Sequence, residues 1–160
     1  MKSNKAAVLS LSALIRQVRR LRRQGKRIAF TNGCFDLLHI GHLDYLERVK
    51  RKADILIVAV NSDSSVRAIK GSGRPVVPQR ERARMLAALK PVDYVTLFSE
   101  PTPLRVIRAI RPDWLVKGAD WKGKRVVGQK EVEAYGGKVI LMPYLKRHST
   151  TGLLARLKSL

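Results

Sequence analysis

The chain has 160 residues, 45% of them hydrophobic, which suffices for one domain with its own core but not for two. Its 33 basic and 12 acidic residues give a net charge of +21. A charge of this sign attracts nucleotides, sugar phosphates, RNA or acidic membranes, and it is larger than a small phosphorylated substrate requires. We assign most of it to surface composition, so nucleic acid is expected to bind only through nonspecific electrostatics.

Several features argue against a membrane or secreted protein. No apolar segment is long enough to span a bilayer, and residues 1–27 lack the apolar core and cleavage site of a signal peptide. The single cysteine, Cys34, cannot form an internal disulfide, as is usual in a reducing compartment. The sequence therefore predicts a cytoplasmic protein.

Residues 1–24 are expected to form a basic helical extension before a single domain at residues 25–160, with residues 1–7 disordered. Ser12 can cap a helix that runs to about Gln24. Four apolar residues recur at helical spacing among arginines: Leu14, Ile15, Val18 and Leu21. This pattern favours a helix packed on the domain or on a second subunit. The alternative is an arginine-rich arm for nucleic acid, although it lacks interleaved aromatic residues.

Short apolar runs alternate with helical patterns through the rest of the chain. Strands are expected at residues 27–31, 55–60, 92–98, 114–116 and 138–142. Helices are expected at residues 41–52, 63–69, 79–89, 102–110, 128–135 and 150–157. This order, without a hairpin signal, predicts an α/β fold: a single Rossmann-like, doubly wound, parallel five-stranded sheet with helices on both faces.

Ligands of such sheets bind beyond the carboxyl ends of the strands. Three motifs fall there: residues 33–42 after the first strand, residues 117–118 after the fourth, and residues 148–151 after the fifth. In the first motif a glycine turn opens a helix, and His39 and His42 lie one helical turn apart at its start. The N–H groups and partial positive charge of a helix N-terminus suit an anion such as phosphate.

The residue types in these motifs leave alternatives open. A zinc site at His39 and His42 lacks a third ligand at a suitable spacing, and thiol catalysis by Cys34 lacks an activating base. Asp36 either orients the turn or positions a substrate or a metal-bound water. Residues 149–151 either only cap the last helix or add a second set of phosphate-binding groups.

Residues 33–42 read G-C-F-D-L-L-H-I-G-H. This motif resembles the pattern Gly-x-Phe-Asp-x-x-His-x-Gly-His, which is typical of the cytidylyltransferase-like branch of the nucleotidyltransferase superfamily, and it matches that pattern at every defined position. Five further motifs follow in order: V-N-S-D at 60–63, I-K-G at 69–71, R-P-V at 74–76, L-V-K-G at 115–118 and S-T-T-G-L-L at 149–154. Together they resemble the heptose 1-phosphate adenylyltransferases, which occur as the second domain of a bifunctional kinase–adenylyltransferase or as a separate protein. The resemblance runs from about Gly25 to the last residue.

The resemblance implies that AMP passes in one step from ATP to D-glycero-D-manno-heptose 1-phosphate, giving ADP-heptose and pyrophosphate for lipopolysaccharide core biosynthesis. It implies His39, His42 and Lys70 as catalytic residues, and Mg²⁺ carried by the nucleotide phosphates rather than by a protein metal site. The implied nucleotide-binding residues are Thr31, Asn32, Gly33, Cys34, Phe35, Gly41, His42, Lys117, Gly118, Ser149, Thr150 and Thr151. The implied substrate-binding residues, on the sugar-phosphate side, are Asp36, Asn61, Asp63 and Arg74. By family analogy, the protein forms a homodimer and receives its sugar 1-phosphate from a separate kinase.

The base and the acceptor are less strongly indicated than the reaction. Glycerol phosphate cytidylyltransferases carry Arg-Thr-Glu-Gly before Ser-Thr, where this chain has Y-L-K-R-H at residues 144–148, and this difference argues against that branch. In its favour, residues 121–124, W-K-G-K, resemble a tryptophan-containing stretch of the same branch. The alternatives are the same chemistry on glycerol 3-phosphate with CTP, or on FMN with ATP. An alternative of another class is a nucleic-acid-binding protein on this scaffold.

Overall fold

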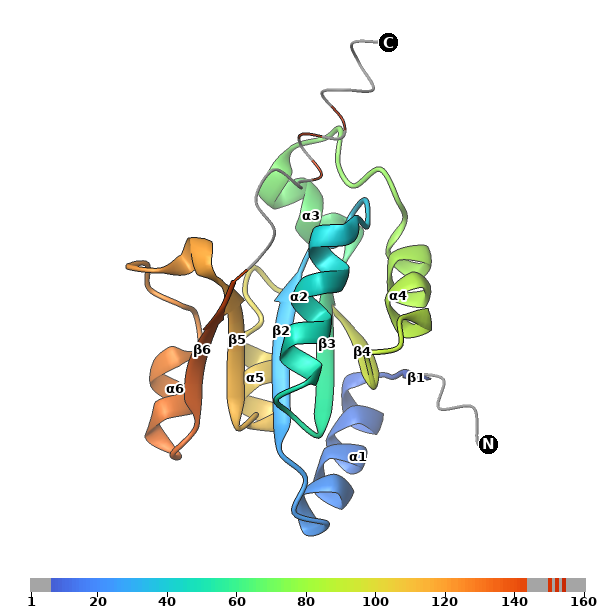
Figure 1. Cartoon of the computed structure of the whole chain (residues 1–160). Helices are drawn as coiled ribbons and strands as arrows, with labels where there is room; N and C mark the ends of the chain where they lie inside the picture. Colours follow the sequence, from blue (N-terminus) through green and yellow to red (C-terminus); the bar gives the residue numbers. More distant parts are fainter. Residues whose placement is uncertain (1–6, 144–149, 151, 153, 155–160) are drawn as a thin grey trace.

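The computed structural model describes residues 7–143 together with residues 150, 152 and 154. Within this part of the chain, six strands alternate with the helices (Figure 1). The strands are β1 (Ala7–Val8), β2 (Ile28–Gly33), β3 (Ile55–Asn61), β4 (Tyr94–Phe98), β5 (Trp114–Gly118) and β6 (Lys138–Met142). The helices are α1 (Leu11–Arg23), α2 (Ile40–Lys50), α3 (Asp63–Lys70), α4 (Gln79–Ala88), α5 (Leu104–Ile110), α6 (Gln129–Ala134) and the 3-10 helix η1 (Ala119–Trp121).

The strands form one parallel sheet in the order β1-β4-β3-β2-β5-β6. From β2 the chain adds β3 and then β4 on one side, and it later crosses over to add β5 and β6 on the other (Figure 1). The strand order therefore reverses at β2, which is where doubly wound sheets bind their ligands. This arrangement confirms the predicted fold class, with six strands rather than five.

The additional strand is β1, of which the sequence analysis placed Ala7 in a disordered segment and gave Val8 no strand. Ala7 and Val8 pair with β4, and the Leu9 N–H donates to the Val95 carbonyl at 2.8 Å. Two residues are too few to show the alternation of a strand in the sequence. β1 forms because its backbone pairs with the outer edge of β4, a contact that the sequence alone does not reveal. The helix that follows starts earlier than predicted, because Ser10 rather than Ser12 accepts the capping hydrogen bond, from the Ala13 N–H.

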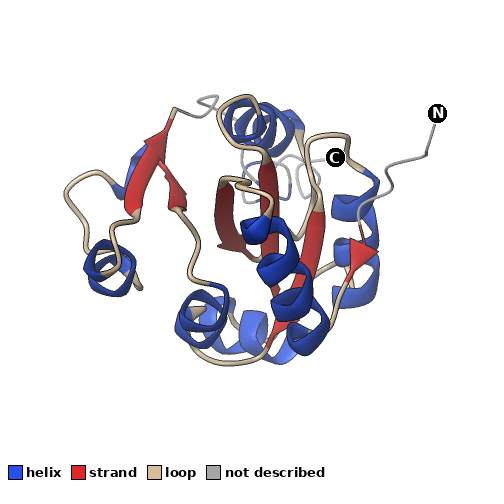
Figure 2. Cartoon of the chain, turned by 90° about the horizontal axis from the view of Figure 1, so that it is seen from below, coloured by secondary structure: helices blue, strands red, loops and turns tan. Residues whose placement is uncertain are grey.

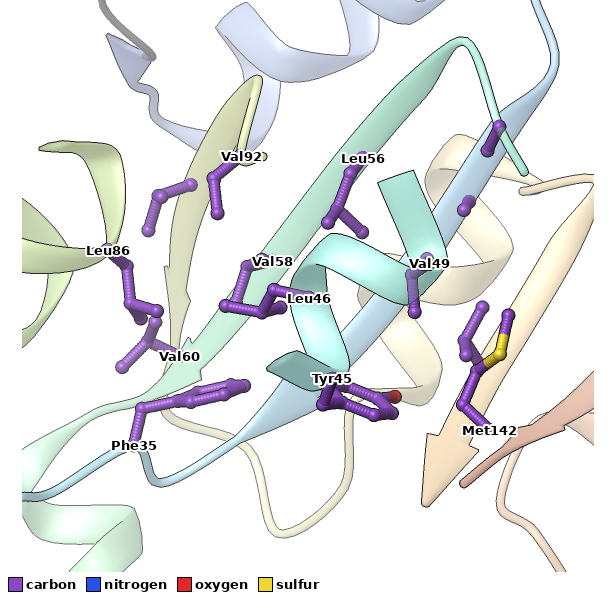
Figure 3. Close-up of a cluster of buried hydrophobic side chains, with 14 of the residues drawn as sticks. Phe35, Tyr45, Leu46, Val49, Leu56, Val58, Val60, Leu86, Val92 and Met142 are labelled. Atoms are coloured by element: carbon purple, nitrogen blue, oxygen red, sulfur yellow. The ribbon is translucent and has the colours of Figure 1, made fainter. Parts of the chain in front are cut away.

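Helices cover both faces of the sheet (Figure 2). On one face, side chains of α2 and α4, such as Leu46 and Leu86, pack on alternate residues of β3, among them Val58 (Figure 3). On the other face, α1, α5 and α6 pack on the intervening residues, and Leu14 and Val18 of α1 belong to that core. The predicted apolar stripe of the first helix is therefore buried against the domain, while the division of the chain at residue 24 stays a prediction.

The predicted elements are present, with boundaries that shift by a few residues. β6 has the predicted bounds, whereas β5 continues to Gly118 and α5 begins only after Pro103. Of the helix predicted at 150–157, residues 150, 152 and 154 are described, and all three are helical. None of the described helices is long and apolar enough to cross a bilayer.

Candidate active site

Two stacked imidazoles lie at the start of α2. His39 is the N-cap residue, with extended backbone angles (φ −142°, ψ 170°), and His42 lies in the first turn. Their ring centroids are 3.9 Å apart, with 25° between the ring planes. The Phe35 ring lies 5.2 Å from that of His42, and a Cβ on Gly33 would approach the Phe35 ring to 3.1 Å. The predicted pair of histidines on one side of a glycine turn is therefore present.

His42 is a neutral imidazole at pH 7. Burial, and then the neighbouring His39, lower the pKa of His42 to about 4. A neutral imidazole has one N–H donor and one acceptor nitrogen. The Nδ1 atom of His42 is buried and has no hydrogen-bond partner in the described part of the chain. A buried polar atom without a partner at a cavity wall is suited to a bound ligand.

A cavity of about 630 Å³ opens above the histidines, at the carboxyl ends of β2, β3 and β5. Its walls bring together most of the predicted site residues: Thr31, Asn32, Gly33, Cys34, Phe35, Asp36, His39, Gly41, His42, Asn61, Lys70, Arg74, Lys117, Gly118 and Thr150. Asp63 does not line this cavity, and Ser149 and Thr151 lie outside the described residues. Segments that are more than 100 residues apart in the sequence therefore meet in one concave site, as the strand-end argument predicts.

Asp36 ties the loop after α3 to the turn after β2. Its carboxylate is 1% exposed and accepts hydrogen bonds from Arg74 Nε at 2.6 Å and from the N–H groups of Val76 and Val77 at 2.9 Å. Burial alone would raise the pKa of Asp36, but the hydrogen bonds from Val77, Val76 and Arg74 hold that pKa below its ordinary value. These contacts favour a structural role for Asp36, the first of its two alternatives, because they fix Arg74 beside the cavity.

Arg82 is a buried cation that sequence reasoning missed. Its side chain is fully buried, and its guanidinium donates to the carbonyls of Val77, Cys34 and Asn61. It also pairs with Asp63 Oδ1 at 2.8 Å. Arg82 thus joins α4 to the turn after β2 and to the end of β3. Its position four residues before the buried Leu86, on the apolar side of an amphipathic helix, is the signal that could have identified it.

The β5 side of the cavity is lined by different chemistry. Lys117 is largely buried, and burial lowers its pKa to about 8, against the influence of Asp120. Its Nζ atom donates to Asn32 Oδ1 at 2.5 Å and lies 5.2 Å from the centroid of the Trp121 ring. An aromatic ring and an amide beside a buried cation suit a nucleotide base and its ribose better than a second phosphate group.

Four residues of the cavity wall are absent from the predicted set: Tyr45, Ile69, Asp120 and Trp121. Tyr45 lies on the inner side of α2, where its hydroxyl is 3.0 Å from Thr31 Oγ1. Trp121 belongs to a 3-10 turn, which has no long-range period to read from the sequence. Cys34 lines the cavity as a thiol, because burial raises its pKa. Thr150 is placed there by a hydrogen bond from its hydroxyl to the Leu37 carbonyl at 3.2 Å.

Comparison with known proteins decides the family. The cytidylyltransferase-like family model matches residues 30–154, which include His39, His42 and every residue of the cavity wall. The chain belongs to the cytidylyltransferase-like family. Membership confirms the superfamily resemblance stated above, and it makes the chain a nucleotidyltransferase, as predicted.

Individual relatives of this cytidylyltransferase-like chain are longer proteins. The bifunctional protein HldE of Geotalea uraniireducens is 47% identical over 154 residues, and that of Acidiphilium cryptum is 51% identical over 152 residues. These matches cover 96% and 95% of this chain but only 31% of each relative, so the chain spans about a third of their length. A solved structure, the lipopolysaccharide core biosynthesis protein from Thermoplasma volcanium, superposes with a TM-score of 0.63 at 29% identity, over 78% of this chain and all of that one.

Proposed function

We propose that this nucleotidyltransferase transfers AMP from ATP to D-glycero-D-manno-heptose 1-phosphate, giving ADP-heptose and pyrophosphate for lipopolysaccharide core biosynthesis. The observation that carries the proposal is the stacked pair His39–His42 at the start of α2, inside a cavity with Lys70 and Arg74 on one side and Trp121 on the other. Cations on one side suit an acceptor phosphate and the aromatic ring on the other suits a base, so the reacting phosphates would lie between them at the imidazoles.

In the proposed reaction, an oxygen of the sugar 1-phosphate attacks the α-phosphorus of ATP in line with the leaving group. A new P–O bond forms while the bond from the α-phosphorus to the α,β-bridging oxygen breaks, and pyrophosphate leaves with that electron pair. The attacking phosphate is already ionised at pH 7, so the site needs no general base. Catalysis then consists of positioning the reactants and stabilising the charge that develops.

The described residues supply both effects. His39 and His42 donate hydrogen bonds to oxygens of the reacting phosphates, and Lys70, at the end of α3, adds a positive charge beside them. Thr31, Asn32, Lys117 and their neighbours hold the nucleotide, and Thr150, with Ser149 and Thr151, binds its phosphates. Asn61 and Arg74 bind the sugar phosphate, whereas Asp36 holds their loop and Asp63 acts through Arg82. Removing one such donor from a phosphoryl or acyl transfer site typically lowers kcat by about 10²–10³.

Mg²⁺ is proposed to arrive on the triphosphate. It prefers oxygen ligands, and the described residues contain no group of three or more His, Cys, Asp or Glu side chains that could hold a metal ion. The buried carboxylate at the cavity, Asp36, already accepts hydrogen bonds from Arg74 and two backbone N–H groups. The nucleotide phosphates are therefore the better ligands, and an ion bound there screens their charge.

Three findings support the choice of substrate. The motifs from residue 60 to residue 154 resemble those of the heptose 1-phosphate adenylyltransferases. The HldE relatives are bifunctional proteins, and the matched crystal structure is described as that of a lipopolysaccharide core biosynthesis protein. By the same analogy we propose a homodimer, a cytoplasmic location and a separate kinase domain that supplies the sugar 1-phosphate.

Pyrophosphate release tests the proposal. ATP and CTP are each offered with heptose 1-phosphate, glycerol 3-phosphate and FMN, to the wild type and to His42→Ala. Asp44→Ala, on the same helix but outside the cavity wall, is the matched control. We expect release only with ATP and heptose 1-phosphate, lost in His42→Ala and retained in Asp44→Ala. Pyrophosphate release with another pair would show that the enzyme uses a different nucleotide or acceptor. No release with any pair would contradict the proposed nucleotidyltransferase activity.

A further inference from the structure

The first helix has a basic face that the cavity does not use. Leu14, Val18 and Leu21 of α1 are buried. At 100° per residue, the opposite side of the helix consists of four exposed arginines, here called the α1 basic face: Arg16, Arg19, Arg20 and Arg23. The buried stripe alone explains why the helix packs on the domain, so these four charges need a separate explanation.

No acidic residue balances this face. The sequence contains none before Asp36, and the α1 basic face forms no ion pair or hydrogen bond within the described part of the chain. Its arginines lie three and four residues apart, and like charges at these spacings destabilise a helix. Arg22, which points to the side of the helix, shows the contrast, because it donates to the carbonyls of Ile110 and Arg111. Arg20 and Arg23 lie in the last turn of α1, where the helix dipole favours cations, but no ion pair within the described chain offsets the repulsion along the rest of the face.

The basic surface continues past the helix, at the end of the sheet opposite to the cavity (Figure 1). Four further exposed cations lie at that end: Lys26, Arg27, Arg51 and Lys52. The aspartates of that end are engaged by the first N–H groups of the strands. Asp54 accepts from Arg27 N and Asp113 from Ile28 N, both at 2.8 Å, and Asp93 accepts from Leu56 N at 2.7 Å. These carboxylates keep their negative charge: Asp54 lies near Lys26 and Arg27, and Arg51 pairs with Glu47 at 3.9 Å. The uncompensated positive charge of this end therefore lies mainly on the α1 basic face.

The hollows that suit a small ligand lie elsewhere on the described part of the molecule. The cavity described above and the smaller one near Ser62 and Glu100 lie at the carboxyl ends of the strands. Two nearby aromatic rings are covered by cations, since Arg27 lies 5.0 Å above Trp114 and Arg111 lies 4.7 Å above Tyr135, and the hydroxyl of a third, Tyr94, accepts a hydrogen bond from Gln17 of α1 at 2.8 Å. Base stacking on aromatic side chains is the usual means of holding single-stranded nucleic acid. The helix is also laid flat on the domain, so it does not protrude as a recognition helix does.

We propose that the α1 basic face is a docking surface for an anionic lipid bilayer, held by electrostatic contacts with phosphate headgroups and without insertion into the acyl layer. Exposed arginines form paired hydrogen bonds with phosphate oxygens, and a row of four arginines along one helix face can contact several headgroups of a bilayer at once. The apolar side of α1 is committed to the core, so binding is peripheral and reversible. Docking at this end leaves the cavity, at the opposite end of the sheet, open to solution. This inference does not depend on the substrate proposed above.

The test is sedimentation of the full chain with two kinds of vesicle: phosphatidylcholine alone, and phosphatidylcholine mixed with phosphatidylglycerol. Each basic residue near an anionic membrane strengthens binding about fivefold. The variant Arg16→Gln/Arg19→Gln/Arg20→Gln/Arg23→Gln should therefore lower the partition coefficient by roughly 100-fold or more. The matched control removes four exposed charges elsewhere: Arg80→Gln/Arg84→Gln/Lys130→Gln/Lys138→Gln.

We expect the wild type and the control to bind only the mixed vesicles, and to be released in 1 M salt, where the Debye length falls to about 3 Å. The α1 variant should remain in solution while keeping the wild-type thermal midpoint or exceeding it, because like-charge repulsion is removed. Equal binding of the α1 variant and the control would overturn the proposal, since net charge alone would then suffice. So would a lack of binding to mixed vesicles, including the case in which duplex RNA binds through α1 instead.

Discussion

Arg82→Met replaces a fully buried guanidinium with an apolar side chain. The carbonyls of Val77, Cys34 and Asn61 each lose a hydrogen-bond donor, and Asp63 loses its ion-pair partner. Removing one partner of a buried ion pair costs about 3–5 kcal/mol, and an unsatisfied buried acceptor costs about 1–3 kcal/mol. Because the side chain of Asp63 is 28% exposed and regains water, we expect a loss of about 3 kcal/mol in unfolding free energy, the lower end of that range.

Urea unfolding measures this loss. With a denaturant slope of about 1–3 kcal/mol per M, the unfolding midpoint should fall by roughly 1–3 M. Arg84→Met, two residues along the same helix and exposed, is the matched control and should change stability by less than about 0.5 kcal/mol. Under folding conditions kcat should also fall about 100-fold, because the turn that carries Cys34 shifts relative to the histidines. If Arg82→Met and Arg84→Met have the same urea unfolding midpoint, the Arg82 guanidinium does not hold α4, the turn after β2 and the end of β3 together.

Three further outcomes follow from the site. His42→Ala should lower kcat by about 100-fold or more with an unchanged unfolding midpoint at pH 7, and a near-normal kcat would remove His42 from the mechanism. Between pH 7 and pH 5 the wild type should lose roughly 2 kcal/mol more unfolding free energy than His42→Gln. The reason is that His42 stays neutral in the folded chain down to about pH 4, whereas in the unfolded chain it takes up a proton below pH 6.5. Parallel stability profiles of the two proteins against pH would contradict this. Lys117→Met should raise KM for ATP at least about tenfold with a smaller change in kcat, because Lys117 orients Asn32 by a charge-assisted hydrogen bond. An unchanged KM for ATP would refute that role.

Local periodicity accounts for what could be predicted of the fold. The apolar stripe of α1, the bounds of β6 and the stacked pair His39–His42 depend on residues a few positions apart, and all three are present in the structure. The strand-end argument also predicted that distant motifs meet, because parallel strands deliver their carboxyl ends to one edge of a sheet. Lys117 and His42 accordingly share one cavity.

The residues that could not be predicted depend on tertiary packing. A basic residue in a helix is ordinarily assigned to solvent, yet Arg82 is fully buried because the carbonyls of three segments converge on it. Asp63 lies two residues after the end of β3, where a ligand-binding residue could be expected, but it pairs with Arg82 and does not line the cavity. Trp121 lies in a 3-10 turn whose position is set by β5 and not by any repeat.

The most direct measurement of the central claim follows the α-phosphorus of ATP. ATP labelled with a radioactive α-phosphorus is incubated with heptose 1-phosphate, Mg²⁺ and the purified chain, and the products are separated by charge and mass. Nucleotidyl transfer at the His39–His42 site predicts that the label passes into ADP-heptose, that the pyrophosphate is unlabelled, and that both products form at least about 100-fold more slowly with His42→Ala. Label that stays in ATP, or appears in pyrophosphate, while other phosphate acceptors also remain unmodified, would contradict the account.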